Sequence, residues 1–73
     1  MKSYNAKDTG VRIQEERKAM NLSREALADD INISVKYLGN IELGKQIMSS
    51  EILFNLSNVL NSSTDYLLGI NLK

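Results

Sequence analysis

The stretch LSREALADDINISVKYLGNIELGK, residues 22–45, has the pattern of two short helices joined by one tight turn. Ser23 and Ser34 each stand directly before a run with helical spacing, where a serine hydroxyl accepts a hydrogen bond from an unpaired backbone N–H. Within each run the apolar residues recur at intervals of three and four, so each helix has one buried stripe and one solvated face. These apolar residues are Ala26, Leu27, Ala28 and Ile31 in the first run and Tyr37, Leu38 and Ile41 in the second.

The turn and the end of this unit are marked by two residues that tolerate a left-handed backbone. Asn32 lies in the short connection, and asparagine is the best residue after glycine for a positive φ. Gly44 follows the second run, as glycine does where a helix ends in a left-handed residue. The pattern therefore predicts helices over residues 23–31 and 34–43.

Three further helices are predicted around this pair, over residues 8–20, 49–60 and 63–68. Asp8 or Thr9 is the expected cap of the first of them, and Ser49 caps the helix over residues 49–60. The fold class is therefore all-α, with five helices in a single domain of residues 8–73.

Residues 1–7 show little periodicity and are expected to form a flexible N-terminal arm. Terminal disorder without a role is the simplest interpretation, since chain ends are often poorly ordered. The alternative is an arm that contacts phosphate groups through Lys2 and Lys7.

Composition narrows the possible functions. The 73 residues include no cysteine and no histidine, so the core must come from packing alone, and neither a disulfide nor a common zinc site is expected. No glycine-rich phosphate loop or cofactor site is visible, and so short a chain cannot enclose a substrate pocket, which excludes an enzyme. No apolar run approaches the roughly 18 residues of a membrane span. The N-terminus also lacks an apolar signal core, which predicts a cytoplasmic location, nucleoid-associated when bound to DNA.

The combined pattern resembles the helix-turn-helix of the phage repressor and Cro-type family, also called the XRE type. The resemblance extends from about Val11 to Gly69 and departs from the family at Asn32, where glycine is usual, and at Met48, where proline is frequent. It implies a compact five-helix repressor-like domain that binds double-stranded DNA. The residues that carry it are Arg17, Leu22, Ser23, Leu27, Ala28, Ile31, Ser34, Tyr37, Leu38, Ile41, Glu42, Gly44, Lys45, Leu53, Leu56, Leu60, Asp65, Tyr66, Leu67 and Leu68.

The outward face of the helix after Ser34 carries the candidate DNA-reading residues. Val35, Lys36, Gly39 and Asn40 recur with the spacing of one helical face. Lysine donates to guanine, asparagine pairs with adenine, and valine packs on the thymine methyl group. We expect base contacts from Ser34, Val35, Lys36 and Asn40. Without the resemblance, a merely solvated helix face explains Lys36 and Asn40 equally well.

Contacts with the DNA backbone are expected on both sides of this face. In the family, the residue matching Arg24 lies beside the groove, although an exposed arginine without a partner is the simpler interpretation. Tyr37 is ambiguous, because its ring could be core while its hydroxyl reaches a phosphate. Lysine and glutamine in the following loop suit phosphate contacts, and a merely solvated lysine is the alternative. The expected backbone contacts are Ser23, Arg24, Tyr37, Gly39, Lys45 and Gln46.

Arg17 falls on the inner face of the first predicted helix, where a lone guanidinium is costly to bury. It therefore needs a carboxylate, and Glu42 is the candidate. The resemblance implies the same structural ion pair. A solvated Arg17 is the alternative.

The last apolar residues are expected to form a homodimer interface. Tyr66, Leu67, Ile70 and Leu72 would otherwise form an exposed apolar cluster on a monomer. In the family this region commonly lies at a two-fold axis. The competing interpretation is that these residues complete the core of a small domain.

Two functions follow from these observations. The first is sequence-specific DNA binding as a transcriptional regulator, a dimeric repressor that reads an inverted-repeat operator. The second is a protein-interaction module of the antitoxin or antirepressor type, which the formal net charge of +0 favours because nucleic-acid-binding domains often carry a basic excess. Neither function calls for a metal, a cofactor or a small-molecule ligand.

Overall fold

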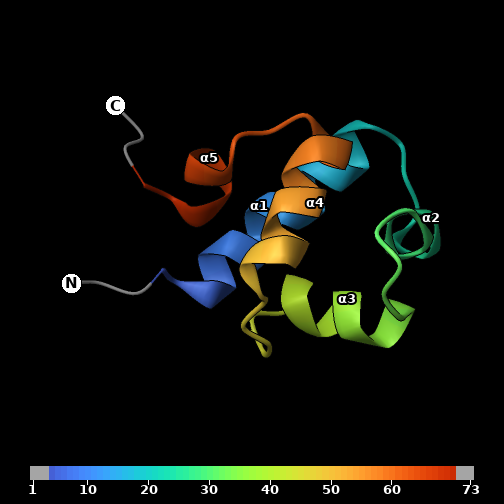
Figure 1. Ribbon diagram of the computed structural model, residues 1–73, viewed down its shortest axis with the longest axis horizontal. Coiled ribbons are helices and arrows are strands. Elements are labelled where there is room, and N and C mark those ends of the chain that lie inside the picture. The colour runs from blue at the N-terminus through green and yellow to red at the C-terminus, as the bar shows by residue number, and fades with distance from the viewer. Residues whose placement is uncertain (1–3, 71–73) are drawn as a thin grey trace.

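The computed structural model describes residues 4–70, and over this range the chain folds into five helices with no strand (Figure 1). The predicted all-α class is confirmed. None of these helices is long and apolar enough to cross a membrane. The helices are α1 (Ala6–Ala19), α2 (Arg24–Asp30), α3 (Val35–Glu42), α4 (Ser50–Leu60) and α5 (Thr64–Leu68).

Four of the five helices begin at the serine that the sequence places there. In each case the serine Oγ accepts from the backbone N–H three residues later, which satisfies one of the free donors of the first turn. The acceptor–donor pairs are Ser23 with Ala26 (3.0 Å), Ser34 with Tyr37 (3.0 Å), Ser49 with Ile52 (3.2 Å) and Ser63 with Tyr66 (3.0 Å).

The first helix begins earlier than the sequence predicts, because Asn5 is its cap. The Oδ1 atom of Asn5 accepts from the N–H of Asp8 at 3.0 Å, and the expected caps Asp8 and Thr9 both lie inside the helix. Asp8 falls in the first turn, where its charge suits the helix dipole. Lys7, expected in a flexible arm, is therefore an exposed helical residue. Lys2 lies outside the described residues.

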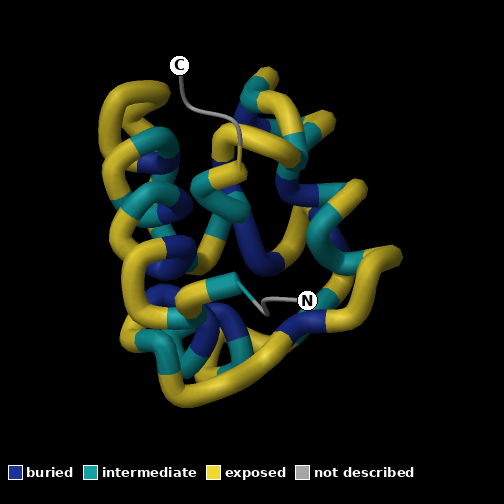
Figure 2. The backbone as a smooth tube through the Cα atoms, turned by 90° about the vertical axis from the view of Figure 1, so that its left-hand side faces the viewer, coloured by how far each residue is buried: buried dark blue, intermediate teal, exposed yellow. Residues whose placement is uncertain are grey.

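Helix α1 holds the domain together, since it packs against α3, α4 and α5, while α2 packs on α3. Figure 2 shows the buried segments facing one another across the interior and the exposed segments turned outward. The core is built from the apolar stripes of the helices and contains Ile13, Leu27, Ala28, Ile31, Leu38, Ile41, Met48, Leu56, Leu60 and Leu67.

Helices α1 and α3 touch through their backbones at Gly10. A Cβ atom at residue 10 would lie only 2.4 Å from the carbonyl oxygen of Glu42 and 2.5 Å from that of Ile41. The neighbouring Thr9 is fully buried, and its hydroxyl has no hydrogen-bond partner within residues 4–70. This crossing sets the distance at which α3 sits from the body of the domain.

The predicted left-handed residues adopt that conformation. Asn32 has a φ of +61° between α2 and α3, and Gly44 has a φ of +77° after α3. Residue 44 must be glycine for a second reason as well, because a Cβ atom there would lie 2.6 Å from the Cα of Lys7. Asparagine at the turn thus adopts the left-handed conformation for which glycine is usual in the family.

The backbone of Met48 makes a hydrogen bond that the proline frequent at this position in the family could not make. Its backbone N–H donates to the hydroxyl of Tyr4 at 3.3 Å, and proline has no N–H. The side chain of Met48 is buried in the core. This bond fastens the chain before α1 to the loop before α4.

Candidate nucleic-acid interface

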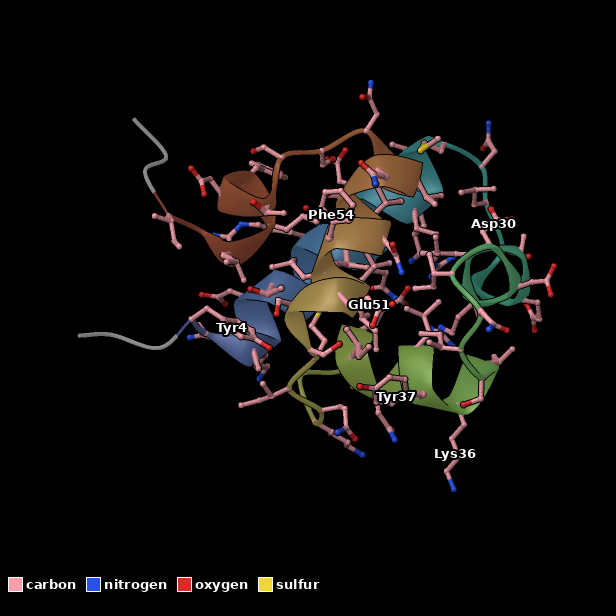
Figure 3. The ribbon with its side chains drawn as sticks, viewed as in Figure 1. Tyr4, Asp30, Lys36, Tyr37, Glu51 and Phe54 are labelled. Atoms are coloured by element: carbon pink, nitrogen blue, oxygen red, sulfur yellow. The ribbon has the colours of Figure 1, made fainter. Side chains whose placement is uncertain are left out.

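Helix α3 lies along one edge of the molecule, with its outward face free of other described elements (Figure 1). Val35 and Lys36 are exposed, and Asn40 is half-buried. Figure 3 shows Lys36 extending away from the body of the domain. On the opposite side of the helix, Leu38 and Ile41 are buried in the core, which fixes the direction in which the outward face points.

The outward face carries groups that can distinguish base pairs. The ammonium of Lys36 is a donor, the amide of Asn40 both donates and accepts, and Val35 is apolar. Ser34 is exposed at the start of the helix, and its hydroxyl keeps its own proton for donation while its oxygen caps α3. A helix presented in this way fits the major groove of DNA, which is about 12 Å wide.

The buried ion pair of Arg17 and Glu42 links α1 to the end of α3. It is the pair predicted from the sequence. Arg17 Nε donates to Glu42 Oε2 at 2.7 Å, and Arg17 Nη2 donates to Glu42 Oε1 at 3.1 Å. A third bond runs from Arg17 Nη1 to the carbonyl oxygen of Leu22 at 2.9 Å. The guanidinium is thus satisfied on all three nitrogens, as a buried charge requires.

Arg24 has a partner that the sequence did not reveal. Its Nε donates to Oε1 of Glu42 at 3.2 Å, so the solvated arginine without a partner, which the sequence left open, is wrong. The two residues lie 18 positions apart on different helices, and no local pattern connects them. The side chain of Arg24 is nevertheless 38% exposed, so part of the guanidinium faces solvent.

The other expected backbone-contact residues lie around α3. Lys45 and Gln46 are exposed in the loop after the helix, and Ser23 is exposed before α2. Tyr37 is half-buried, and it packs against the hydrophobic core. Gly39 lies under the side chain of Arg24.

Two exposed apolar side chains beside Lys45 and Gln46 were not anticipated. Leu43 is 61% exposed and Ile47 is 67% exposed. The sequence offered one signal of this exposure. Both residues flank the segment of Gly44, Lys45 and Gln46 and fall outside the apolar stripes of α3 and α4. They make the loop after α3 partly apolar.

The acidic end of α2 points away from the outward face of α3. Asp29 and Asp30 are both exposed at the C-terminal end of α2. Figure 3 places Asp30 beside α2, on another side of the molecule from the edge where Lys36 extends. The carboxylate of Asp30 therefore lies apart from the edge of α3 that carries Lys36.

The expected dimer residues fall into two environments. Tyr66 is 38% exposed and Ile70 is 50% exposed, but Leu67 is completely buried. Leu67 belongs to the domain's own core, so its assignment to an exposed interface is wrong. Leu72 lies outside the described residues. Val11, which was not among the expected dimer residues, is exposed and lines a shallow hollow together with Tyr66. About 200° of helix separates Val11 from the buried Ile13, a signal that could have identified it.

The fold and the exposed second helix of the α2–α3 pair define a helix-turn-helix domain. The family model described as Helix-turn-helix matches residues 13–67, which is most of the chain. The chain belongs to this family, in its phage repressor and Cro-type branch.

Two proteins of Bacillus subtilis (strain 168) are similar in sequence. The HTH-type transcriptional regulator ImmR is 37% identical over 60 residues, which cover 82% of this chain and 47% of ImmR. The chain thus spans about half the length of ImmR. YazB, an uncharacterized HTH-type transcriptional regulator, is 40% identical over 58 residues, covering 80% of this chain and 84% of YazB. Both are transcriptional regulators and not enzymes.

Among solved structures, the P22 c2 repressor in complex with a synthetic operator has the same fold. Its TM-score is 0.79 at 32% sequence identity, and the match covers 82% of this chain and 91% of the repressor.

Proposed function

We propose that this protein is a sequence-specific DNA-binding transcriptional regulator that reads double-stranded DNA with α3. The observation that carries this proposal is the outward face of α3, where Val35 and Lys36 are exposed beside Asn40. These three side chains match the donor, acceptor and methyl pattern of the major groove. The operator complex of the P22 c2 repressor, which has the same fold, gives the proposal further support.

We further propose that the regulator acts as a homodimer on an inverted-repeat operator and represses by occupying it. A two-fold dimer of such domains presents its two α3 helices to half-sites about one DNA turn, 34–36 Å, apart. The exposed side chains of Val11, Tyr66 and Ile70 on α1 and near α5 support a second copy at this surface. Apolar side chains gathered on one side of a small domain are stabilised when a partner covers them.

Selection of binding sites from random DNA tests the regulatory function. An enriched inverted repeat is expected, and recovery of no enriched sequence would contradict the proposal. On the selected site, Lys36→Ala and Asn40→Ala should each weaken binding by about 1–3 kcal/mol. Lys18→Ala is the matched control, because Lys18 is also exposed but lies in the last turn of α1 and not on the outward face of α3. It removes the same charge and should leave the sequence preference unchanged.

Lys45→Ala separates phosphate contact from base contact. A lysine that only contacts phosphate weakens all sequences about equally, and its loss lowers the slope of log K against log salt by about 1. Binding measured at several salt concentrations on the selected site and on a scrambled site gives this slope. A loss confined to the selected site would show that Lys45 contacts bases instead.

The dimer is tested by measuring mass in solution. Tyr66→Glu and Ile70→Glu place a charge on the proposed interface and should lower the dimer fraction and the affinity for a full operator. Phe54→Glu is the matched control, because Phe54 is also an exposed apolar residue, on α4, and is not part of the proposed interface. Equal masses for all variants and the wild type would contradict the dimer.

The protein-interaction module remains the competing function, favoured by the formal net charge of +0. Such a module should bind its partner with little dependence on salt and without effect from Lys36→Ala or Asn40→Ala. The same variants therefore discriminate between the two functions.

A further inference from the structure

The carboxylate of Glu42 is shared by two arginines that differ in their surroundings. Its side chain is 1% exposed and accepts three hydrogen bonds, two from Arg17 and one from Arg24. Arg17 is 8% exposed, whereas Arg24 is 38% exposed. The carboxylate therefore has one side in the core and one side toward the surface beside α3.

The charges of this cluster do not cancel. One carboxylate faces two guanidinium groups, which leaves one excess positive charge. Arg17 uses Nε, Nη1 and Nη2 for hydrogen bonds inside the domain. Arg24 donates only through Nε within residues 4–70, so both of its Nη atoms keep their donors for a group outside the domain. The excess charge and the free donors thus coincide on Arg24.

Gly39 provides the surface on which Arg24 lies. A Cβ atom at residue 39 would sit 3.8 Å from Cδ and 4.0 Å from Nη1 of Arg24, which is ordinary contact distance. The guanidinium therefore rests against the outward face of α3, between the turns that carry Lys36 and Asn40. A side chain longer than alanine at residue 39 would occupy this space.

We propose that Glu42 is a positioning residue for DNA binding, because it holds Arg24 against Gly39 so that the Nη atoms donate to a backbone phosphate beside the groove that α3 enters. This inference rests on the proposed function and assigns to the buried ion pair a role besides stability. A guanidinium fork held in place loses less conformational entropy when it binds a phosphate than a free side chain does. The contact would fix the register of α3 on the DNA.

A double-mutant cycle on DNA affinity tests the coupling. Arg24→Ala should weaken binding to the selected operator about tenfold and lower the salt slope by about 1. Glu42→Gln should weaken binding about fivefold in the wild-type background and less than twofold in the Arg24→Ala background. Equal losses in both backgrounds would overturn the inference, because Glu42 would then act on the fold and not through Arg24.

Arg24→Lys keeps the positive charge but loses the Nε donor and the planar guanidinium, and the fold should tolerate it because the side chain is 38% exposed. It should bind the operator at least fivefold more weakly than the wild type, whereas equal affinity would show that charge alone suffices and would overturn the inference. This variant leaves the buried pair of Arg17 and Glu42 in place. It therefore tests the role of Arg24 even where Glu42→Gln fails to fold.

The geometric step is testable without DNA. In nuclear magnetic resonance spectra, the Nε–H of Arg24 should exchange slowly with water in the wild type and rapidly in Glu42→Gln. The Nε–H of the half-buried Arg12, which makes no hydrogen bond to a carboxylate within residues 4–70, is the reference in the same spectrum. Rapid exchange in the wild type would overturn the inference. Failure of the wild type to bind any DNA contradicts the proposed function, whereas wild-type binding that Arg24→Ala leaves unchanged contradicts only the role of Arg24 and Glu42.

Discussion

Substitution of Gly10 by alanine should destabilise the domain, although the same change in an exposed helix interior stabilises by about 1 kcal/mol. The added Cβ atom would lie 2.4 Å and 2.5 Å from two carbonyl oxygens at the end of α3, where ordinary contacts begin near 3.4 Å. Both neighbours are backbone atoms, so relief requires α1 and α3 to separate by roughly 1 Å. Overpacking of this kind costs about 1–3 kcal/mol, occasionally more.

The middle of this cost, about 2 kcal/mol, less the gain of about 1 kcal/mol in helix propensity leaves a net loss of about 1 kcal/mol for Gly10→Ala, which for a domain of this size lowers the Tm by about 4–8 °C. Gly39→Ala is the matched control, because Gly39 is also inside a helix but its nearest neighbour would be Cδ of Arg24 at 3.8 Å. It should raise the Tm by a few degrees. Thermal unfolding followed by circular dichroism measures both changes. A Gly10→Ala variant at least as stable as the wild type would refute the reasoning.

Three further changes test the core and the turn through urea unfolding. Thr9→Val removes a buried hydroxyl without a partner in residues 4–70 and should stabilise by about 1 kcal/mol; a loss would mean that the hydroxyl is hydrogen-bonded in solution. Asn32→Ala should destabilise by about 1 kcal/mol because the backbone there is left-handed, while Asn32→Gly should not. Equal stabilities of these two variants would contradict this reasoning. Arg17→Leu should destabilise by about 3 kcal/mol, because it leaves the buried carboxylate of Glu42 without its main partner. Adding Glu42→Leu should recover part of the loss. No recovery would show that the uncompensated carboxylate is not the cause.

Features that depend on neighbours along the chain were predictable. The serine caps of α2 to α5 act over three residues, and the left-handed turn at Asn32 depends on that residue's own backbone. The outward face of α3 follows from helical spacing alone. Even the error at α1 is local, because Asn5, Asp8 and Thr9 can all cap a helix, and the sequence alone does not decide between them.

The pairing of Arg17 with Glu42 was also predictable, because burial of a charge demands an opposite charge and the family resemblance implies Glu42 as the partner. The second partner of Glu42 was not. Arg24 has a plausible solvent-exposed role by itself, so nothing in its local sequence demanded a carboxylate. Leu67 shows the same limit, since an apolar residue on a short terminal helix suits the core and an interface equally.

The amino-acid sequence by itself determined where helices begin and turn, which faces are apolar and which side chains α3 presents, because these properties arise from interactions within a few residues. Only the tertiary structure decided how near α1 and α3 lie at Gly10, that one buried carboxylate holds both Arg17 and Arg24, and that Leu67 is enclosed. Those outcomes depend on how helices distant in the chain pack in three dimensions, and packing responds to the shapes of all the contacting side chains together.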